Sequence, residues 1–244
     1  EDPASLGEKN VTIDRGAFEQ VLFSRANYEK SAFAEAVAGV SLVHFRFVKA
    51  DTLEKVFAES SDALRKLLQR GGGLMFDHSP TTPAAKRFLK EVGVFDPNES
   101  LVSGRDFWGI ADFDALGKEH VLFQKPRYIY QPWIGSRMQS SACYAKWDVG
   151  KQIAPFIVNE RDSPEKGRKY AMCVCQDKVL GAGRVIFQVN DGAFTTWYEG
   201  ITYGENLFSY AIGMDLREHK RKVTLLYGGV GTPVKFPEII RNGF

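Results

Sequence analysis

Two adjacent residues, Asp77 and His78, have the types and spacing best suited to proton chemistry in this chain. They follow a short apolar run at 74–76 that is typical of a buried strand. A His beside a carboxylate could act as a general base, so one hypothesis makes Asp77 and His78 an acid-base pair. In the alternative, Asp77 caps the turn or the next helix while His78 hydrogen-bonds a neighbouring loop.

The next residue, Ser79, could be a nucleophile activated by His78. Its flanking residues lack the Gly-x-Ser-x-Gly spacing that forms a strained nucleophile elbow, so we expect no more than a ligand contact from it. A metal site could combine Asp77, His78 and Asp191, but four His in 244 residues without tight ligand spacing do not specify one. We therefore expect neither a metal nor another cofactor.

The remaining His residues are weaker candidates. His44 alternates within a predicted strand, where a satisfied core histidine is the usual role, and His219 lies in a charged, solvated run.

A second group of candidate ligand-binding residues follows the first and the late strand of the predicted sheet. These residues are Arg25, Tyr28, Asn190, Asp191 and Trp197, with Tyr198 beside them. If the two strand ends meet, the group would line a cleft. Its cationic side chain could bind an anion, its polar groups could bind hydroxyls, and its aromatic rings could stack against a ligand. That chemistry suits a sugar or another small polar ligand. Alternatively, Trp197 and Tyr198 cover the sheet edge and Arg25 pairs with Asp77.

Strands and helices alternate through the N-terminal part of the chain. Strand-like runs lie at 20–24, 41–48 and 71–78, and helical patterns follow them at 28–37, 51–69 and 83–93. Asp51 and Glu54 resemble a helix cap, and Thr82 before Pro83 predicts another. Such alternation indicates crossover connections and a parallel sheet, with the glycine-led strand at 71–78 in its centre.

The pattern then becomes irregular. Residues 96–152 are rich in aromatic residues, and we interpret them as an irregular insertion with short strands. Runs at 170–175 and 184–189 predict an antiparallel pair, and 205–212 and 223–227 predict a short helix and a last strand. The predicted fold is one α/β domain over 1–228, with a mostly parallel sheet, helices on both faces and an antiparallel late strand pair. Residues 229–244 are a tail or the start of a following module.

Composition excludes several partners and leaves others open. With 32 Lys and Arg against 30 Asp and Glu, the formal charge of +2 predicts no nucleic-acid partner. No apolar run is long enough for a transmembrane helix. The chain starts without Met or an apolar signal, which leaves its compartment open and favours export over the cytoplasm. Three cysteines, at 143, 173 and 175, are too few for a disulfide scaffold.

Two passages carry a family resemblance: 64–78, with its Gly-Gly-Gly-Leu-Met-Phe-Asp-His end, and 183–191, followed by Trp197 and 204–213. They resemble the class I glutamine amidotransferase-like superfamily, in particular the trehalose-utilisation (ThuA-like) proteins and a related bacterial domain family of unknown function. Residues 23–28 look closer to the second of these. The resemblance covers about 20–95 and 168–214, and it implies a flavodoxin-like fold.

The same resemblance bears on activity. True class I amidotransferases carry a cysteine nucleophile on the turn after the central strand, where this chain has Asp77, His78 and Ser79. Cys173 and Cys175 lie on a different predicted strand and face one side, as buried structural thiols do. We therefore do not expect glutamine hydrolysis.

Three functions fit these observations. The first is a non-catalytic amidotransferase-like domain that binds a small polar ligand, a sugar, a protein partner or another copy of itself, within a larger exported bacterial assembly. The second is a hydrolase or isomerase on carbohydrate-like substrates that uses Asp77 and His78. The third is a purely structural assembly domain, which would account for the segment at 96–152.

Overall fold

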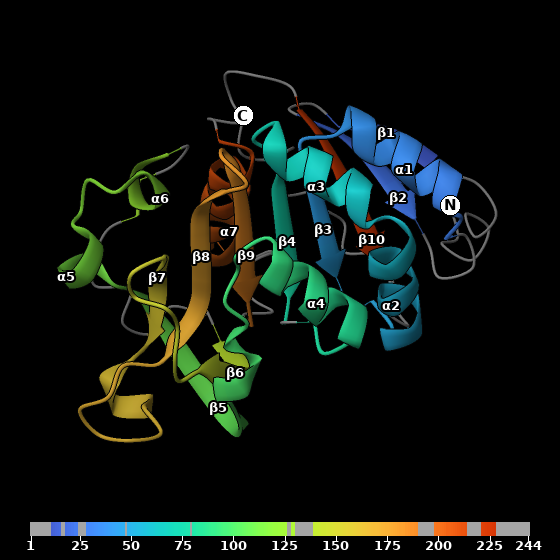
Figure 1. Cartoon of the computed structure of the whole chain (residues 1–244). Coiled ribbons are helices and arrows are strands. Elements are labelled where there is room, and N and C mark those ends of the chain that lie inside the picture. Colours follow the sequence, from blue (N-terminus) through green and yellow to red (C-terminus); the bar gives the residue numbers. More distant parts are fainter. Residues whose placement is uncertain are drawn as a thin grey trace.

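The computed structural model describes residues 11–15, 18–23, 28–46, 48–78, 80–125, 128–129, 139–189, 198–213 and 221–227 (Figure 1). The strands of this part form one sheet in the order β1, β2, β10, β3, β4, β9, β8, β6, β5, β7. Their bounds, in sheet order, are Val11–Arg15, Phe18–Phe23, Arg221–Tyr227, Leu42–Arg46, Gly73–Asp77, Gly183–Gln188, Ala171–Val179, Gln139–Tyr144, Leu101–Ala111 and Gln152–Val158.

The strand β4 lies inside this sheet, between β3 and β9, and runs parallel to both. β10 is parallel to β2 and β3 on the other side. The apolar runs predicted as strands at 20–24, 41–48, 71–78 and 223–227 are confirmed as β2, β3, β4 and β10. The carboxyl ends of β3, β4 and β9 therefore lie at the same edge.

The prediction of a mostly parallel, flavodoxin-like sheet is wrong. Among the described strands, four pairings are parallel and six are antiparallel. The antiparallel pair predicted late in the chain, β8 with β9, is confirmed. It belongs to a larger antiparallel half, because β5, β6 and β7 add to it. Strand direction depends on which segments meet, and the apolar pattern of one segment does not encode that.

The strands β5, β6, β7 and β8 close into an antiparallel barrel. β5 pairs with β6 and β7, and β8 pairs with the same two strands. The segment 96–152, predicted as an irregular insertion with short strands, does contain the short strand β6, but it is more regular than predicted, since β5 runs over 11 residues. The first half of β5 is mostly exposed and only the second half alternates, with Phe107, Gly109 and Ala111 buried. Half a strand of alternation is a weak signal.

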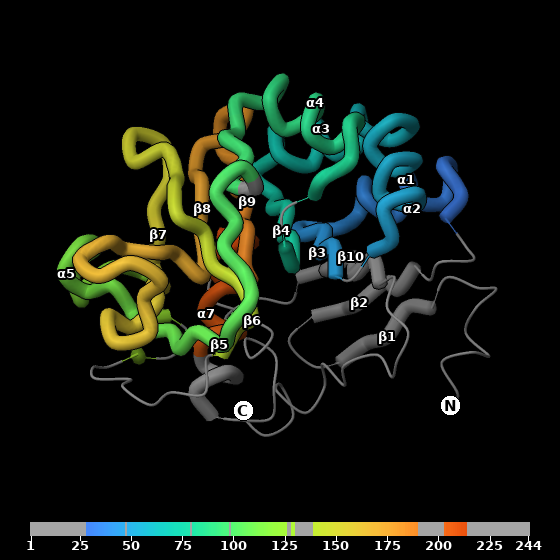
Figure 2. Tube along the Cα trace, turned by 90° about the horizontal axis from the view of Figure 1, so that it is seen from below, coloured from blue at the N-terminus to red at the C-terminus, as the bar shows by residue number. Residues whose placement is uncertain are grey.

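Helices cover the two faces of the sheet unequally (Figure 2). One face carries α1, α2, α3 and α4, with bounds Lys30–Gly39, Ala50–Glu59, Ser61–Gln69 and Pro83–Glu91. The other face carries α7, Tyr198–Ile212, which starts earlier than the predicted helix. The sheet has one hydrophobic core on each face, and alternate residues of each inner strand point into one or the other. Leu74 and Phe76 pack toward α1–α4, and Met75 packs toward α7. The short helices are α5 Phe113–Leu116, α6 Val121–Gln124, and the 3₁₀ turns Pro97–Ser100 and Glu160–Asp162.

The predicted long helix at 51–69 is two helices, because the chain breaks at Ser60. Ser60 is buried, and its hydroxyl is 3.0 Å from the hydroxyl of Tyr28. Glu54 does not cap its own helix: its carboxylate accepts a hydrogen bond of 2.8 Å from the backbone N–H of Ala84, in the first turn of α4. Thr82 occupies the predicted N-cap position, but its side chain makes no capping hydrogen bond.

Two glycines at 71 and 73 explain the entry into β4. Gly71 has a φ of +87°, and the N–H groups of Gly71 and Gly72 bond to the carbonyls of Leu68 and Leu67. This arrangement is a Schellman ending of α3, which glycine favours. At Gly73, a Cβ would lie 2.5 Å from the carbonyl oxygen of Ala211. The strand and α7 can therefore approach this closely only without a side chain at 73.

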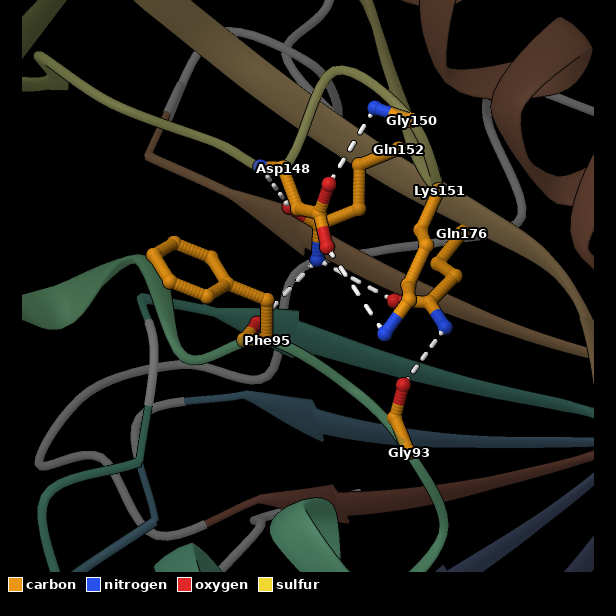
Figure 3. A network of polar contacts seen from close by, with 7 residues as sticks. All are labelled: Gly93, Phe95, Asp148, Gly150, Lys151, Gln152 and Gln176. Atoms are coloured by element: carbon orange, nitrogen blue, oxygen red, sulfur yellow. Dashed lines mark hydrogen bonds and ion pairs between the residues drawn. The ribbon is translucent and has the colours of Figure 1, made fainter.

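A buried polar network joins the barrel to the end of α4 (Figure 3). The amide of Gln152 donates to the carbonyl of Phe95 at 3.1 Å and to the side chain of Gln176 at 3.3 Å. Gln176 in turn donates to the carbonyl of Gly93 at 2.9 Å. Both Gln side chains come from the barrel strands β7 and β8, so they fix the barrel against the chain that leaves α4.

Candidate functional site

The carboxyl end of β4 holds the two residues that the sequence singles out. The side chain of Asp77, the last residue of β4, is 7 % exposed. His78 follows, partly exposed, with a φ of +67°. Few residues other than glycine adopt this left-handed conformation, so the turn after β4 carries backbone strain.

The carboxylate of Asp77 is held by three side chains. Its Oδ1 lies 2.7 Å from Nε2 of His44 and accepts a hydrogen bond of 2.5 Å from the amide of Gln188. Its Oδ2 lies 3.6 Å from Nη1 of Arg46. All three partners come from the neighbouring strands β3 and β9, so the strand pairing itself builds this cluster.

These contacts decide the charge of Asp77. Burial alone would raise its pKa, but the electrostatic attraction and hydrogen bond of His44, the charge of Arg46 and the hydrogen bond from Gln188 outweigh it. The pKa of Asp77 is therefore below its ordinary value. Asp77 is a fixed carboxylate at neutral pH and has no proton to donate.

Gln188 also holds the backbone at the turn. The N–H of His78 donates to the main-chain carbonyl of Gln188 at 2.7 Å, while the side chain of Gln188 bonds to Asp77. One residue of β9 therefore fixes both Asp77 and His78.

Asp77 and Gln188 belong to a line of residues that crosses the sheet under α7. We call Arg46, Asp77, Gln188 and Cys173 the polar row. Asp77 is in register with Gln188, and Gln188 with Cys173. Tyr203 of α7 lies beside Cys173, and burial raises the pKa of its phenol far above the ordinary value. Further polar side chains of α7 are buried too: Glu205, Asn206 and Ser209.

The thiols are buried, as the sequence predicts for Cys173 and Cys175. These two sulfurs lie 3.6 Å apart on the α7 side of β8, and burial raises the pKa of Cys175. Cys143 lies in the other core, where burial raises its pKa to about 12. Protonated, enclosed thiols are poor nucleophiles. Within the described ranges, no three His, Cys, Asp or Glu side chains are grouped to hold a metal ion.

Tyr28 is not part of this cluster. Its ring packs edge-on against Phe33 at 5.7 Å and its hydroxyl reaches Ser60, so it belongs to the core on the α1–α4 side of the sheet. Asp77 and its partners face the other side. The remaining candidates, Arg25, Ser79, Asn190, Asp191 and Trp197, lie outside the described residues, as do residues 229–244.

Sequence reasoning missed the partners of Asp77, namely His44, Arg46 and Gln188. His44 is indeed a core histidine, but it contacts the leading candidate residue. A signal was present: His44 and Arg46 alternate onto one face of β3, and a buried Arg or His needs a partner. The sequence does not show that β4 is the neighbour that supplies the carboxylate.

The fold and this site define the class of the protein, which is mixed α/β with an antiparallel barrel. One buried carboxylate, held by three side chains, lies at the end of its inner parallel strands. No family model matches the chain, and neither a curated protein nor a solved structure matches it. The resemblance to amidotransferase-like proteins therefore stays a prediction. Within the part of the chain that the structure describes, no helix is long and apolar enough to cross a membrane.

Proposed function

We propose that this chain binds a small polar ligand at the carboxyl end of β4, with His78 as the contact residue. Asp77 has a positioning role there and does not transfer protons. The observation that carries this proposal is the left-handed backbone of His78 directly after an inner parallel strand.

A left-handed conformation at a residue other than glycine costs about 1–2 kcal/mol. Such a cost persists where the surrounding structure enforces it, and these positions gather at functional sites. Here the enforcement is visible, since Gln188 binds both the backbone of His78 and the side chain of Asp77. Ligands also bind preferentially at the carboxyl ends of parallel strands.

The contacts of Asp77 favour binding over catalysis by an Asp77 and His78 pair. The histidine that contacts the carboxylate is His44, at 2.7 Å, and its side chain is fully buried. A carboxylate with a lowered pKa is also a weak base and carries no proton at neutral pH. Both properties support an electrostatic and structural role.

The test compares the wild-type chain with His78→Asn. Asparagine tolerates the left-handed conformation but lacks the imidazole, so the fold should persist. The probes are glucose, as a hydroxyl-rich ligand, and inorganic phosphate, as an anion, each followed by NMR at the His78 side chain. Native mass spectrometry of the purified wild-type chain would detect a small molecule that is already bound.

We expect one probe or a co-purified small molecule to bind, and His78→Asn to weaken that binding about tenfold or more, a loss typical of one good hydrogen bond to a ligand. His120→Asn is the matched control, because His120 is also partly exposed but caps α6 elsewhere in the fold. Its binding should be unchanged. Absence of any bound small molecule, with no response to either probe, would refute the proposal.

A further inference from the structure

A second cluster of titratable side chains contains neither Asp77 nor its partners. His120 comes directly before α6, and its ring centroid lies 6.3 Å from that of Tyr210 in α7. The hydroxyl of Tyr210 donates to Oδ1 of Asp177, and Nε of Arg184 lies 3.4 Å from the same oxygen. The charge of Asp177 also acts on His120. A proton gained by His120 would therefore be attracted by a carboxylate of β8.

The hydrogen bond that His120 makes requires a neutral ring. Its Nδ1 accepts a bond of 3.3 Å from the backbone N–H of Leu122, so the ring hydrogen is on Nε2. In a protonated histidine both ring nitrogens carry hydrogen, and neither can accept a bond. Protonation of His120 therefore removes the cap of α6.

The capped residue also links α6 to α7. The side-chain amide of Asn206 donates to the carbonyl of Leu122 at 2.8 Å, so both the N–H and the C=O of Leu122 are bonded. The helix α6 covers only Val121–Gln124, and in so short a helix one capping bond is a large share of the backbone order. Loss of this bond should unwind the first turn of α6 where it meets α7.

The helix α7 itself should stay packed during this change. Its residues 203–212 are buried, and its rings contact the sheet and the barrel. The centroids of Tyr203 and Phe156 lie 4.0 Å apart, and those of Phe208 and His44 lie 5.6 Å apart. These contacts do not involve His120, so the effect of its protonation is confined to α6.

We propose that His120 is a pH sensor for α6: the neutral ring caps the helix at Leu122, and the protonated ring leaves Leu122 and pairs with Asp177. A carboxylate has about four acceptor positions on its two oxygens, so Asp177 can keep Tyr210 and Arg184 and still accept from His120. The inference does not depend on the proposed binding function, because its test uses no ligand.

The surrounding groups set the pH at which the sensor responds. Burial lowers the pKa of His120 below its ordinary 6.5, and the charge of Asp177 partly offsets this effect. The stabilisation by the cap is therefore present above about pH 6.5 and is lost as the pH falls through the folded-state pKa. Among the described residues, the charged and titratable side chains around His120 are Asp177 of β8, Arg184 of β9, Tyr210 of α7, and Lys118 and Glu119 of its own segment.

The test is an NMR titration of the wild-type chain from about pH 8 to about pH 5, a range that covers histidine titration. We expect the amide signal of Leu122 to shift with the same midpoint as the ring of His120. The protection of this amide against hydrogen exchange should fall about tenfold or more across that midpoint. If the amide of Leu122 does not follow the titration of His120, the proposal is wrong.

His120→Asn separates the sensor from a general effect of acid. Asparagine is a good N-cap residue and accepts from the backbone N–H at any pH in this range, so α6 should stay capped. The amide of Leu122 should then keep its shift and its protection on acidification. The same loss of protection in His120→Asn would show that another group causes it.

Asp177→Asn tests the pairing of the protonated ring. It removes the negative charge but keeps an acceptor for Tyr210, so the midpoint of His120 should move to lower pH. Glu119→Gln is the control, because Glu119 is exposed on the same segment, where water and salt screen its charge. Its midpoint should match the wild type. An unchanged midpoint in Asp177→Asn would rule out the pairing.

Discussion

Gly73→Ala places a methyl group against the backbone of α7. The new Cβ would lie 2.5 Å from the carbonyl oxygen of Ala211, 3.2 Å from its carbonyl carbon and 3.1 Å from Cδ1 of Leu42. The side chain of Leu42 can rotate, but a carbonyl within a helix moves only with its neighbours. Either α7 or β4 must therefore shift, and both are packed on their other sides.

Overpacking of this kind costs about 1–3 kcal/mol. Because the obstacle is backbone rather than the end of a flexible side chain, we expect the upper part of that range, about 2–3 kcal/mol. For a chain of 244 residues this corresponds to a fall in Tm of roughly 4–12 °C.

The assay is urea unfolding followed by circular dichroism, with thermal unfolding as a second measurement. Gly39→Ala is the control, because Gly39 ends α1 and a Cβ there meets nothing within 4 Å. Alanine is the better helix former by up to about 1 kcal/mol, so this variant should be unchanged or more stable. A Gly73→Ala chain as stable as the wild type would show that α7 does not approach β4 as described.

Two further predictions concern charges and caps. Asp77→Asn should destabilise the chain by about 3–5 kcal/mol at pH 7, because it removes the carboxylate from a buried ion pair with Arg46. The folded-state pKa of Asp77 lies below its ordinary 3.8, so the stabilisation by its carboxylate is present above about pH 4 and is lost as the pH falls through the folded value. The urea midpoints of the wild type and of Asp77→Asn should therefore converge as the pH is lowered. A difference between the midpoints that stays constant with pH would contradict this reasoning. Glu54→Ala should lower the free energy of unfolding by about 1 kcal/mol, because it removes the hydrogen bond to the N–H of Ala84. Thr82→Val should leave that free energy unchanged or raise it, since the Thr82 hydroxyl has no described partner. If instead Thr82→Val costs as much as a lost cap, Thr82 caps α4 after all.

Local sequence patterns were enough to predict individual helices and strands. Gly71 after an apolar helical stripe predicted where α3 ends, and alternation in β3 predicted which residues share a face. These features depend on contacts between residues a few positions apart, so the sequence of one segment is enough to predict them. The break at Ser60 was missed because it depends on a distant contact, the hydroxyl of Tyr28.

The sequence by itself determined the inner strands β3 and β4, the helical segments that follow them except for the break at Ser60, and the polar turn after β4. Only the tertiary structure decided that β5, β6, β7 and β8 close into an antiparallel barrel, and that Asp77 is held by His44, Arg46 and Gln188. The physical reason is the same in both cases. Strand direction and side-chain partnership arise between segments as far apart as Asp77 and Gln188, and which segments meet depends on the packing of the whole chain.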